Sequence, residues 1–135
     1  MRTQAPYMVT AVTRGISISV ETAFQPDYSQ AALQEFIFAY RIYIRNDSVH
    51  PVQLLDRHWE IFDASGEERE VNGAGVIGKQ PIIHPGQEFD YVSSCNLKAE
   101  LGTMEGYYTM MRLADKQRFR VRIPRFQMVV PYKLS

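Results

Sequence analysis

The chain has 135 residues, a length typical of one domain, and equal numbers of basic (15 Lys and Arg) and acidic (15 Asp and Glu) residues. Its zero formal charge excludes the overall charge balance of a nucleic-acid-binding protein, so nucleic acid is an unlikely partner. The strand-forming residues Val, Ile, Thr, Phe, Tyr and Trp total 43, against 17 for Ala and Leu. We therefore expect a single all-β domain over residues 1–135.

Cysteine content and the longest apolar run indicate the compartment. Cys95 is the single cysteine, so no intramolecular disulfide can form, which suits a reducing environment. Residues 1–15 lack the apolar core of a signal peptide. The longest apolar run, residues 36–40, is far short of the ~20 residues that a membrane span needs. We expect a cytoplasmic protein with no membrane association.

Apolar and polar residues alternate with a period of two along most of the chain, which predicts strands with one wet face. Turn signals separate these strands, with a helical turn expected at residues 29–33. Two interruptions are also expected, a loop over residues 95–105 and a strand break at Pro124. The predicted strands cover residues 15–24, 36–44, 52–62, 67–71, 88–93, 107–113, 118–123 and 126–130. Seven to eight short antiparallel strands predict an immunoglobulin-like or fibronectin-III-like β-sandwich.

One predicted strand, residues 52–62, has a register problem. Val52 and Leu54 share one face, whereas Leu55, Trp59 and Ile61 have the opposite parity. A β-bulge between Leu54 and His58 would turn both sets into the core. We expect Trp59 to be buried at the centre, packed with Leu55 and Ile61.

Three glycines, Gly73, Gly75 and Gly78, match the dinucleotide-binding pattern G-x-G-x-x-G. The context excludes a Rossmann fold, because Pro81 follows at once and no helical period appears. One interpretation is that the glycines permit positive φ and a tight crossing between strands. The alternative is that bare amides, with Lys79 beside them, bind an anion or a partner's backbone.

An ordered series of short motifs, spread from about Val9 to Pro131, resembles the ApaG family. The matching residues are Phe38-Ala39-Tyr40, Ile42, Ile44 and Asn46; Val52-Gln53-Leu54-Leu55 and Arg57-His58-Trp59; Val71, Gly73, Gly75-Val76, Gly78 and Gln80-Pro81; Pro85-Gly86, Phe89, Tyr91 and Ser93; Gly102-Thr103-Met104, Gly106, Tyr108 and Met110; Ile123-Pro124 and Phe126.

This resemblance implies a fibronectin-III-like sandwich and an association with cobalt tolerance and magnesium handling. In this family the gene often neighbours one for a dinucleoside-tetraphosphate hydrolase. Related domains occur in some eukaryotic F-box proteins and in a polymerase-interacting protein, which implies a protein-binding module. The late arginines of this chain depart from the family pattern, so a function resting on them is not implied by the resemblance.

Residue patterns for catalysis or for a metal are weak. The three histidines, His50, His58 and His84, show no metal-ligand spacing, so no metal and no cofactor are expected. Cys95 has only Lys98 as a nearby base, so we expect an inert thiol. No nucleophile elbow occurs, and no carboxylate pair has an apolar surround. We do not expect an enzyme.

Charge is distributed unevenly along the chain. Residues 56–70 carry six acids and two bases, whereas residues 112–133 carry seven bases and one acid. Arg118, Arg120 and Arg122 have the same parity and should project from one face of one strand. They form either a solvated or self-paired face, or a guanidinium strip for an acidic partner, phosphate or an opposing subunit. The sequence leaves open whether the acidic and basic regions meet within one chain or across a homodimer.

The sequence thus predicts a non-enzymatic binding module whose partner is an unidentified protein. The candidate binding residues are Arg57, His58, Gly73, Gly75, Gly78, Lys79, Arg118, Arg120 and Arg122. The alternative is a small-ligand module that binds phosphate, nucleotide or a divalent ion at the glycine loop.

Overall fold

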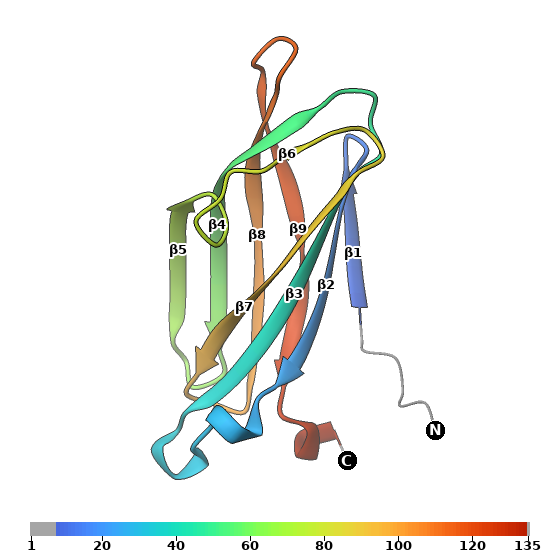
Figure 1. The fold of residues 1–135 in the computed structure, drawn as a ribbon. Coiled ribbons are helices and arrows are strands. Elements are labelled where there is room, and N and C mark those ends of the chain that lie inside the picture. Colours follow the sequence, from blue (N-terminus) through green and yellow to red (C-terminus); the bar gives the residue numbers. More distant parts are fainter. Residues whose placement is uncertain (1–7, 135) are drawn as a thin grey trace, which may run out of the picture.

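A computed structural model describes residues 8–134, and the seven residues before them, part of the segment considered for a signal peptide, lie outside the described range. Two antiparallel sheets pack face to face (Figure 1). The strands are β1 (Met8–Thr13), β2 (Ile16–Phe24), β3 (Phe36–Asn46), β4 (Val52–Asp63), β5 (Glu68–Ala74), β6 (Ile82–Ile83), β7 (Glu88–Leu97), β8 (Leu101–Arg112) and β9 (Arg118–Val129). The predicted all-β sandwich is confirmed, with nine strands in place of seven or eight.

The first sheet has the strand order β1-β2-β3-β7, and the second has the order β5-β4-β8-β9, with β6 added beside β4. Every pairing is antiparallel. β5 and β9 are the two outer strands of this order. No helix in the described part of the chain is long and apolar enough to cross a membrane.

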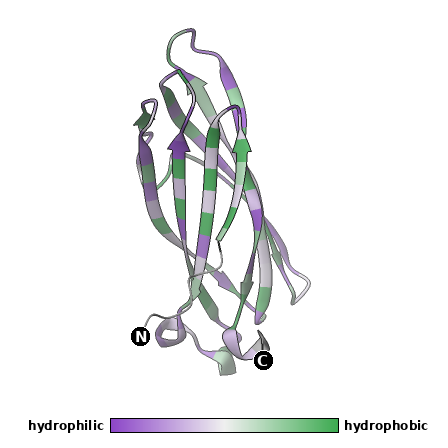
Figure 2. Ribbon diagram, turned by 90° about the vertical axis from the view of Figure 1, so that its right-hand side faces the viewer, coloured by the Kyte–Doolittle hydropathy of each residue, from purple (hydrophilic) through white to green (hydrophobic). Residues whose placement is uncertain are grey.

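The core lies between the sheets because alternate residues of each strand turn inward. Hydrophobic and hydrophilic bands follow one another along the strands (Figure 2). Trp59 is 2% exposed and makes edge-to-face contacts with Tyr40 of the opposite sheet (ring centroids 5.5 Å apart) and with Phe126 (5.9 Å). Its predicted burial is confirmed.

The predicted bulge is also confirmed, because the register of β4 against β8 shifts between Leu54 and Asp56. Val52 and Leu54 before it, and Trp59 and Ile61 after it, are all buried. Leu55 is the extra residue of the bulge and lies outside the core, so the prediction that it packs there with Trp59 is wrong.

Two predicted interruptions of strands are wrong. Residues 95–105 are not one loop, because β7 continues to Leu97 and β8 begins at Leu101. Cys95 is therefore a buried strand residue, paired with Phe38 of β3. Pro124 does not end a strand either. It lies inside β9, where the register against β8 shifts between Met104 and Gly106, and such a bulge tolerates the missing N–H.

Short elements at both ends of the first sheet add to the predicted set. β1 was not expected from the sequence and pairs along its full length with β2. The helical turn expected at residues 29–33 is a 3-10 turn, Ala31–Leu33, and a second 3-10 turn, Pro26–Tyr28, precedes it. The turn at His84–Gln87 has Gly86 at φ +83, the conformation that the third position of a type II turn requires.

Candidate functional site

The glycine motif forms a tight hairpin that follows β5. Backbone bonds run in both directions between Val76 and Lys79, at 2.8 and 2.9 Å. Both residues between them have positive φ, Ile77 at 44° and Gly78 at 75°, as in a type I′ turn. The Gly75 amide donates to the carbonyl of Leu55 at 2.7 Å, which fastens the hairpin to the bulge of β4.

Each of the three glycines is required for a different structural reason. Gly75 has φ +61, and a Cβ there would overlap the carbonyl oxygen of Lys79. Gly78 supplies positive φ at the turn, with open space around it. Gly73 leaves room for the guanidinium of Arg57, whose atoms lie 2.7 to 2.8 Å from the position of a Cβ.

Arg57 fastens the loop to its neighbouring strand. Its Nη1 donates to the carbonyl oxygens of Ala74 (3.1 Å) and Gly75 (2.8 Å). The amides of Gly75, Val76 and Lys79 are likewise committed to partners within the chain. Few donors are thus left for an anion nest, which needs several convergent free N–H groups.

A row of contacting side chains crosses the outer face of the second sheet. The guanidinium of Arg120 on β9 lies 4.2 Å from the ring centroid of Tyr107 on β8. Tyr107 stacks on His58 of β4, with centroids 4.7 Å apart. His58 Nδ1 lies 2.6 Å from Asn72 Oδ1 and 3.6 Å from Glu70 Oε1, both on β5. The row joins β5, β4, β8 and β9 into one polar, partly aromatic surface.

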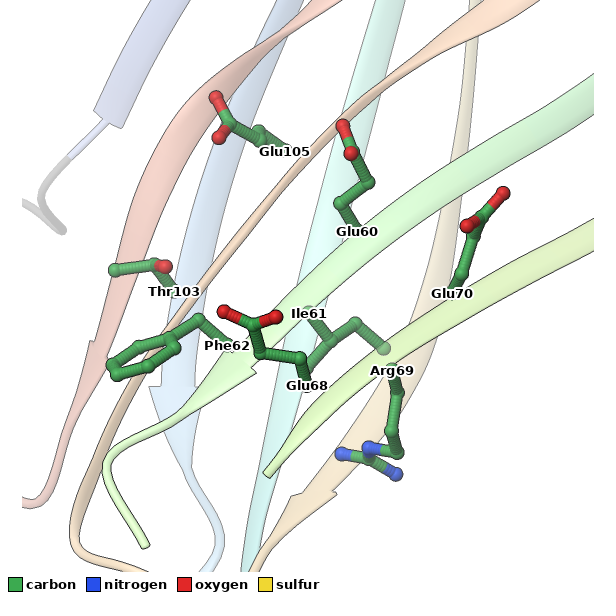
Figure 3. A pocket seen from close by; sticks show the side chains of 8 residues that line it. All are labelled: Glu60, Ile61, Phe62, Glu68, Arg69, Glu70, Thr103 and Glu105. Atoms are coloured by element: carbon green, nitrogen blue, oxygen red, sulfur yellow. The ribbon is translucent and has the colours of Figure 1, made fainter. Parts of the chain in front are cut away.

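Two hollows flank this row. One of about 290 Å³ is lined by Asp56, Arg57, His58, Asn72, Gly73, Tyr107 and Thr109. The other, of about 430 Å³, lies further along the same strands (Figure 3). Four glutamates line it, together with Ile61, Phe62, Arg69 and Thr103: Glu60, Glu68, Glu70 and Glu105.

The structure brings most of the predicted site residues to one sheet. His58 and the arginine strip (Arg118, Arg120 and Arg122) share its outer face, while Gly73 and Arg57 lie beside the smaller hollow. Gly75, Gly78 and Lys79 lie in the hairpin next to the bulge. Glu60 and Glu70 of the acidic region lie on the same outer face as the arginine strip, and no ion pair among the described residues joins the acidic and basic regions. That these residues bind a partner remains a prediction.

Sequence reasoning missed Tyr107, Asn72 and Ile77. Tyr107 and Asn72 share the outward parity of Thr109 and Glu70, a signal that emerges only once strand register is known. Ile77 is a β-branched residue in the left-handed region, which costs about 1–2 kcal/mol, and it is 52% exposed. The sequence gives little indication of this turn, because it has Ile-Gly at the two central positions where type I′ turns favour Asn-Gly.

The described residues include no group of three or more His, Cys, Asp or Glu side chains placed to hold a metal ion. Burial raises the pKa of the Cys95 thiol, although the nearby guanidinium of Arg69 acts in the opposite direction. The arrangement on the outer face offers stacking, ion pairing and hydrogen bonding, which are the contacts of a binding surface.

The fold defines the class of two-sheet antiparallel β-sandwiches, and comparisons with known proteins give the family. The ApaG domain matches residues 26–112. The chain is 44% identical over 128 residues to Protein ApaG of Anaeromyxobacter dehalogenans, covering 95% of this chain and all of that protein. It is 46% identical over 125 residues to Protein ApaG of a Methylobacterium species, covering 93% and 95%. The chain belongs to the ApaG family.

Solved structures agree. A crystal structure of the putative ApaA protein from Bordetella pertussis superimposes with a TM-score of 0.83 at 37% identity, covering 86% of this chain and 94% of that one. An X-ray structure of a structural-genomics target gives a TM-score of 0.84 at 33% identity, covering 93% and 94%.

Proposed function

We propose that this protein is a non-enzymatic binding module of the cytoplasm that recognises another protein through the outer face of the β5-β4-β8-β9 sheet. The observation that supports this most is the row Arg120–Tyr107–His58–Asn72, which crosses the four long strands of the sheet with no layer of the described chain over it. Arg and Tyr are the side chains that protein interfaces favour.

The family's association with cobalt and magnesium handling enters this proposal as an indirect effect, exerted through the partner. The glycine hairpin contributes as a rigid neighbour of the sheet face. It presents the Ile77 side chain at its tip, and strained backbone at such a tip is often found at contact sites.

Site-specific photo-crosslinking tests the proposal. A crosslinking amino acid replaces Thr109 on the outer face of the second sheet, and Ser94 of β7, on the other sheet, is the control position. We expect a crosslinked protein in native cytoplasm from position 109 alone. Tyr107→Ala should abolish it, whereas Tyr43→Ala, which alters the outer face of the first sheet, should not. Equal capture from both faces, or none from position 109, would contradict the proposal.

A further inference from the structure

We infer that the partner which best fits this face is a second copy of the chain, so that two copies associate through the outer faces of their β5-β4-β8-β9 sheets. The inference rests on the proposed function and names the occupant of the same surface. Two sets of charges carry it, the acidic row (Glu60, Glu70 and Glu105) and the arginine strip defined above.

The acidic row consists of carboxylates placed side by side. Glu60 of β4 lies directly opposite Glu70 of β5 on one side and Glu105 of β8 on the other. Figure 3 shows the three side chains in line across the strands, with Glu68 in the next row. Like charges directly opposite one another in a sheet are destabilising.

The row has little counter-charge from its own chain. Among the described residues, no ion pair involves Glu60, Glu68 or Glu105, and Glu70 has only His58 at 3.6 Å. Arg69 lines the same hollow, but its Nη2 donates to the carbonyl of Asn96 at 2.5 Å, on the opposite sheet.

The arginine strip is the complementary set. Its three residues lie opposite Met111, Thr109 and Tyr107 of β8, and all three are exposed. None of them forms an ion pair with the described residues. The guanidinium of Arg120 instead lies over the ring of Tyr107 on β8. The strip lies on β9, at one edge of the sheet, and the acidic row spans the other three strands.

A two-fold axis along the strands brings the basic edge of each copy over the acidic edge of the other. It places β9 of one copy over β5 of the other, and β8 over β4, so each arginine strip meets the acidic side of its partner and the contact occurs twice. Rotation about this axis leaves the height along the strands unchanged, so Arg122 lies one outward position, roughly 7 Å, from the level of the partner's acidic row. Arg120 and Arg118 lie two and three outward positions from that level. A second copy therefore matches the mixed charge of this face. By contrast, a polyanion would be repelled by the glutamates, and a polycation would be repelled by the arginines.

The area of the outer face determines how strongly two copies are expected to associate. Four strands about 4.8 Å apart and some seven residues long present roughly 19 by 24 Å per copy. Such a patch belongs to the weak, transient class of interfaces, below about 1,200 Å² in total. Association should therefore be visible only at high protein concentration and low ionic strength, where surface charges are least screened.

Sedimentation velocity with complementary charge reversals tests the inference. Glu60→Lys with Glu105→Lys makes the face predominantly basic, although Glu68 and Glu70 remain. Arg118→Glu with Arg122→Glu makes it predominantly acidic while leaving the Arg120–Tyr107 contact in place. Glu35→Lys with Glu88→Lys is the matched control, since both residues are exposed and lie outside this sheet. Circular dichroism and thermal melts confirm that each variant is folded.

We expect the wild type and the control to dimerise at a few hundred micromolar in 25 mM salt and to dissociate in 500 mM salt. Each charge-reversed protein alone should associate at least about tenfold more weakly, and an equimolar mixture of the two should recover the dimer. A monomeric wild type at low salt, or a mixture that stays monomeric, would overturn the inference. If the wild type stays monomeric while position 109 still crosslinks to a different protein, the inference fails and the proposed function stands.

Discussion

Replacing Gly75 by Ala should cost far more stability than the same change at Gly78, three residues away in the same hairpin. Both glycines have positive φ, 61° and 75°, so both variants pay the strain of a left-handed residue, about 1 kcal/mol. At Gly78 nothing lies within 4 Å of the new methyl group. At Gly75 the methyl group overlaps the Lys79 carbonyl oxygen, which accepts the 2.8 Å bond from the Val76 amide.

The Gly75 variant must therefore also open the hairpin and give up at least two hydrogen bonds, each worth about 1 kcal/mol net. We expect a loss of about 3 kcal/mol for Gly75→Ala and about 1 kcal/mol for Gly78→Ala. For a domain of this size these values correspond to falls in Tm of about 10 °C and 3–4 °C. Urea titration gives the free energies directly. If the two variants differ by less than about 0.5 kcal/mol, the close approach of Gly75 to Lys79 is not a constraint on this fold.

Three further predictions concern the interior. Trp59→Ala should cost about 3–5 kcal/mol in urea titration, whereas Phe62→Ala on the outer face, where Phe62 is 43% exposed, should cost far less. Burial alone would raise the pKa of Asp63, but N–H groups of Lys98, Ser65 and Ala99 donate to it and lower the pKa overall. Its contribution to stability is therefore complete above about pH 3.9 and is lost as the pH falls, so the gap in unfolding free energy between wild type and Asp63→Asn should narrow toward pH 2. Cys95, which is 7% exposed, should react with a thiol reagent only as fast as the protein unfolds.

The sandwich could be predicted because nearly every strand buries one face. Apolar and polar residues therefore alternate along the sequence of each strand. The bulge of β4 could also be found, since Leu54 and Trp59 must both reach the core although their spacing has the wrong parity. β1 could not be predicted in this way, because its residues are exposed or half-buried along its whole length. Its two faces therefore differ little in burial.

Which strands pair with one another, by contrast, could not be predicted from any single segment of the sequence. Cys95 and Glu105 lie in segments whose apolar and polar residues do not alternate cleanly, and only the partners β3 and β4 show that both are strand residues. Pro124 would end an isolated strand, but here it coincides with a shift in register, where its missing N–H leaves no ladder bond unmade. The glycine letters matched a nucleotide-binding pattern, while the backbone uses them for a hairpin and for the approach of Arg57.

The two outer faces of the sandwich differ in how their charges are satisfied. On the first sheet Arg41 lies 3.4 Å from Asp90, and the Tyr43 hydroxyl donates to Glu21 at 2.6 Å. The second sheet instead places Glu60 between two other carboxylates.

Added salt should therefore stabilise the folded monomer at low protein concentration and weaken association at high protein concentration. At low micromolar protein, where the chain is monomeric, added salt screens the repulsion around Glu60 and should raise the free energy of unfolding. At several hundred micromolar, the same salt should weaken association, because it screens the contacts between the arginine strip and the acidic row. Glu60→Gln with Glu105→Gln removes most of the repulsion and should flatten both salt dependences. Chemical denaturation in urea, which adds no ions, follows the first, and sedimentation follows the second. If this variant keeps the full salt dependence of monomer stability, the repulsion in the acidic row is not significant.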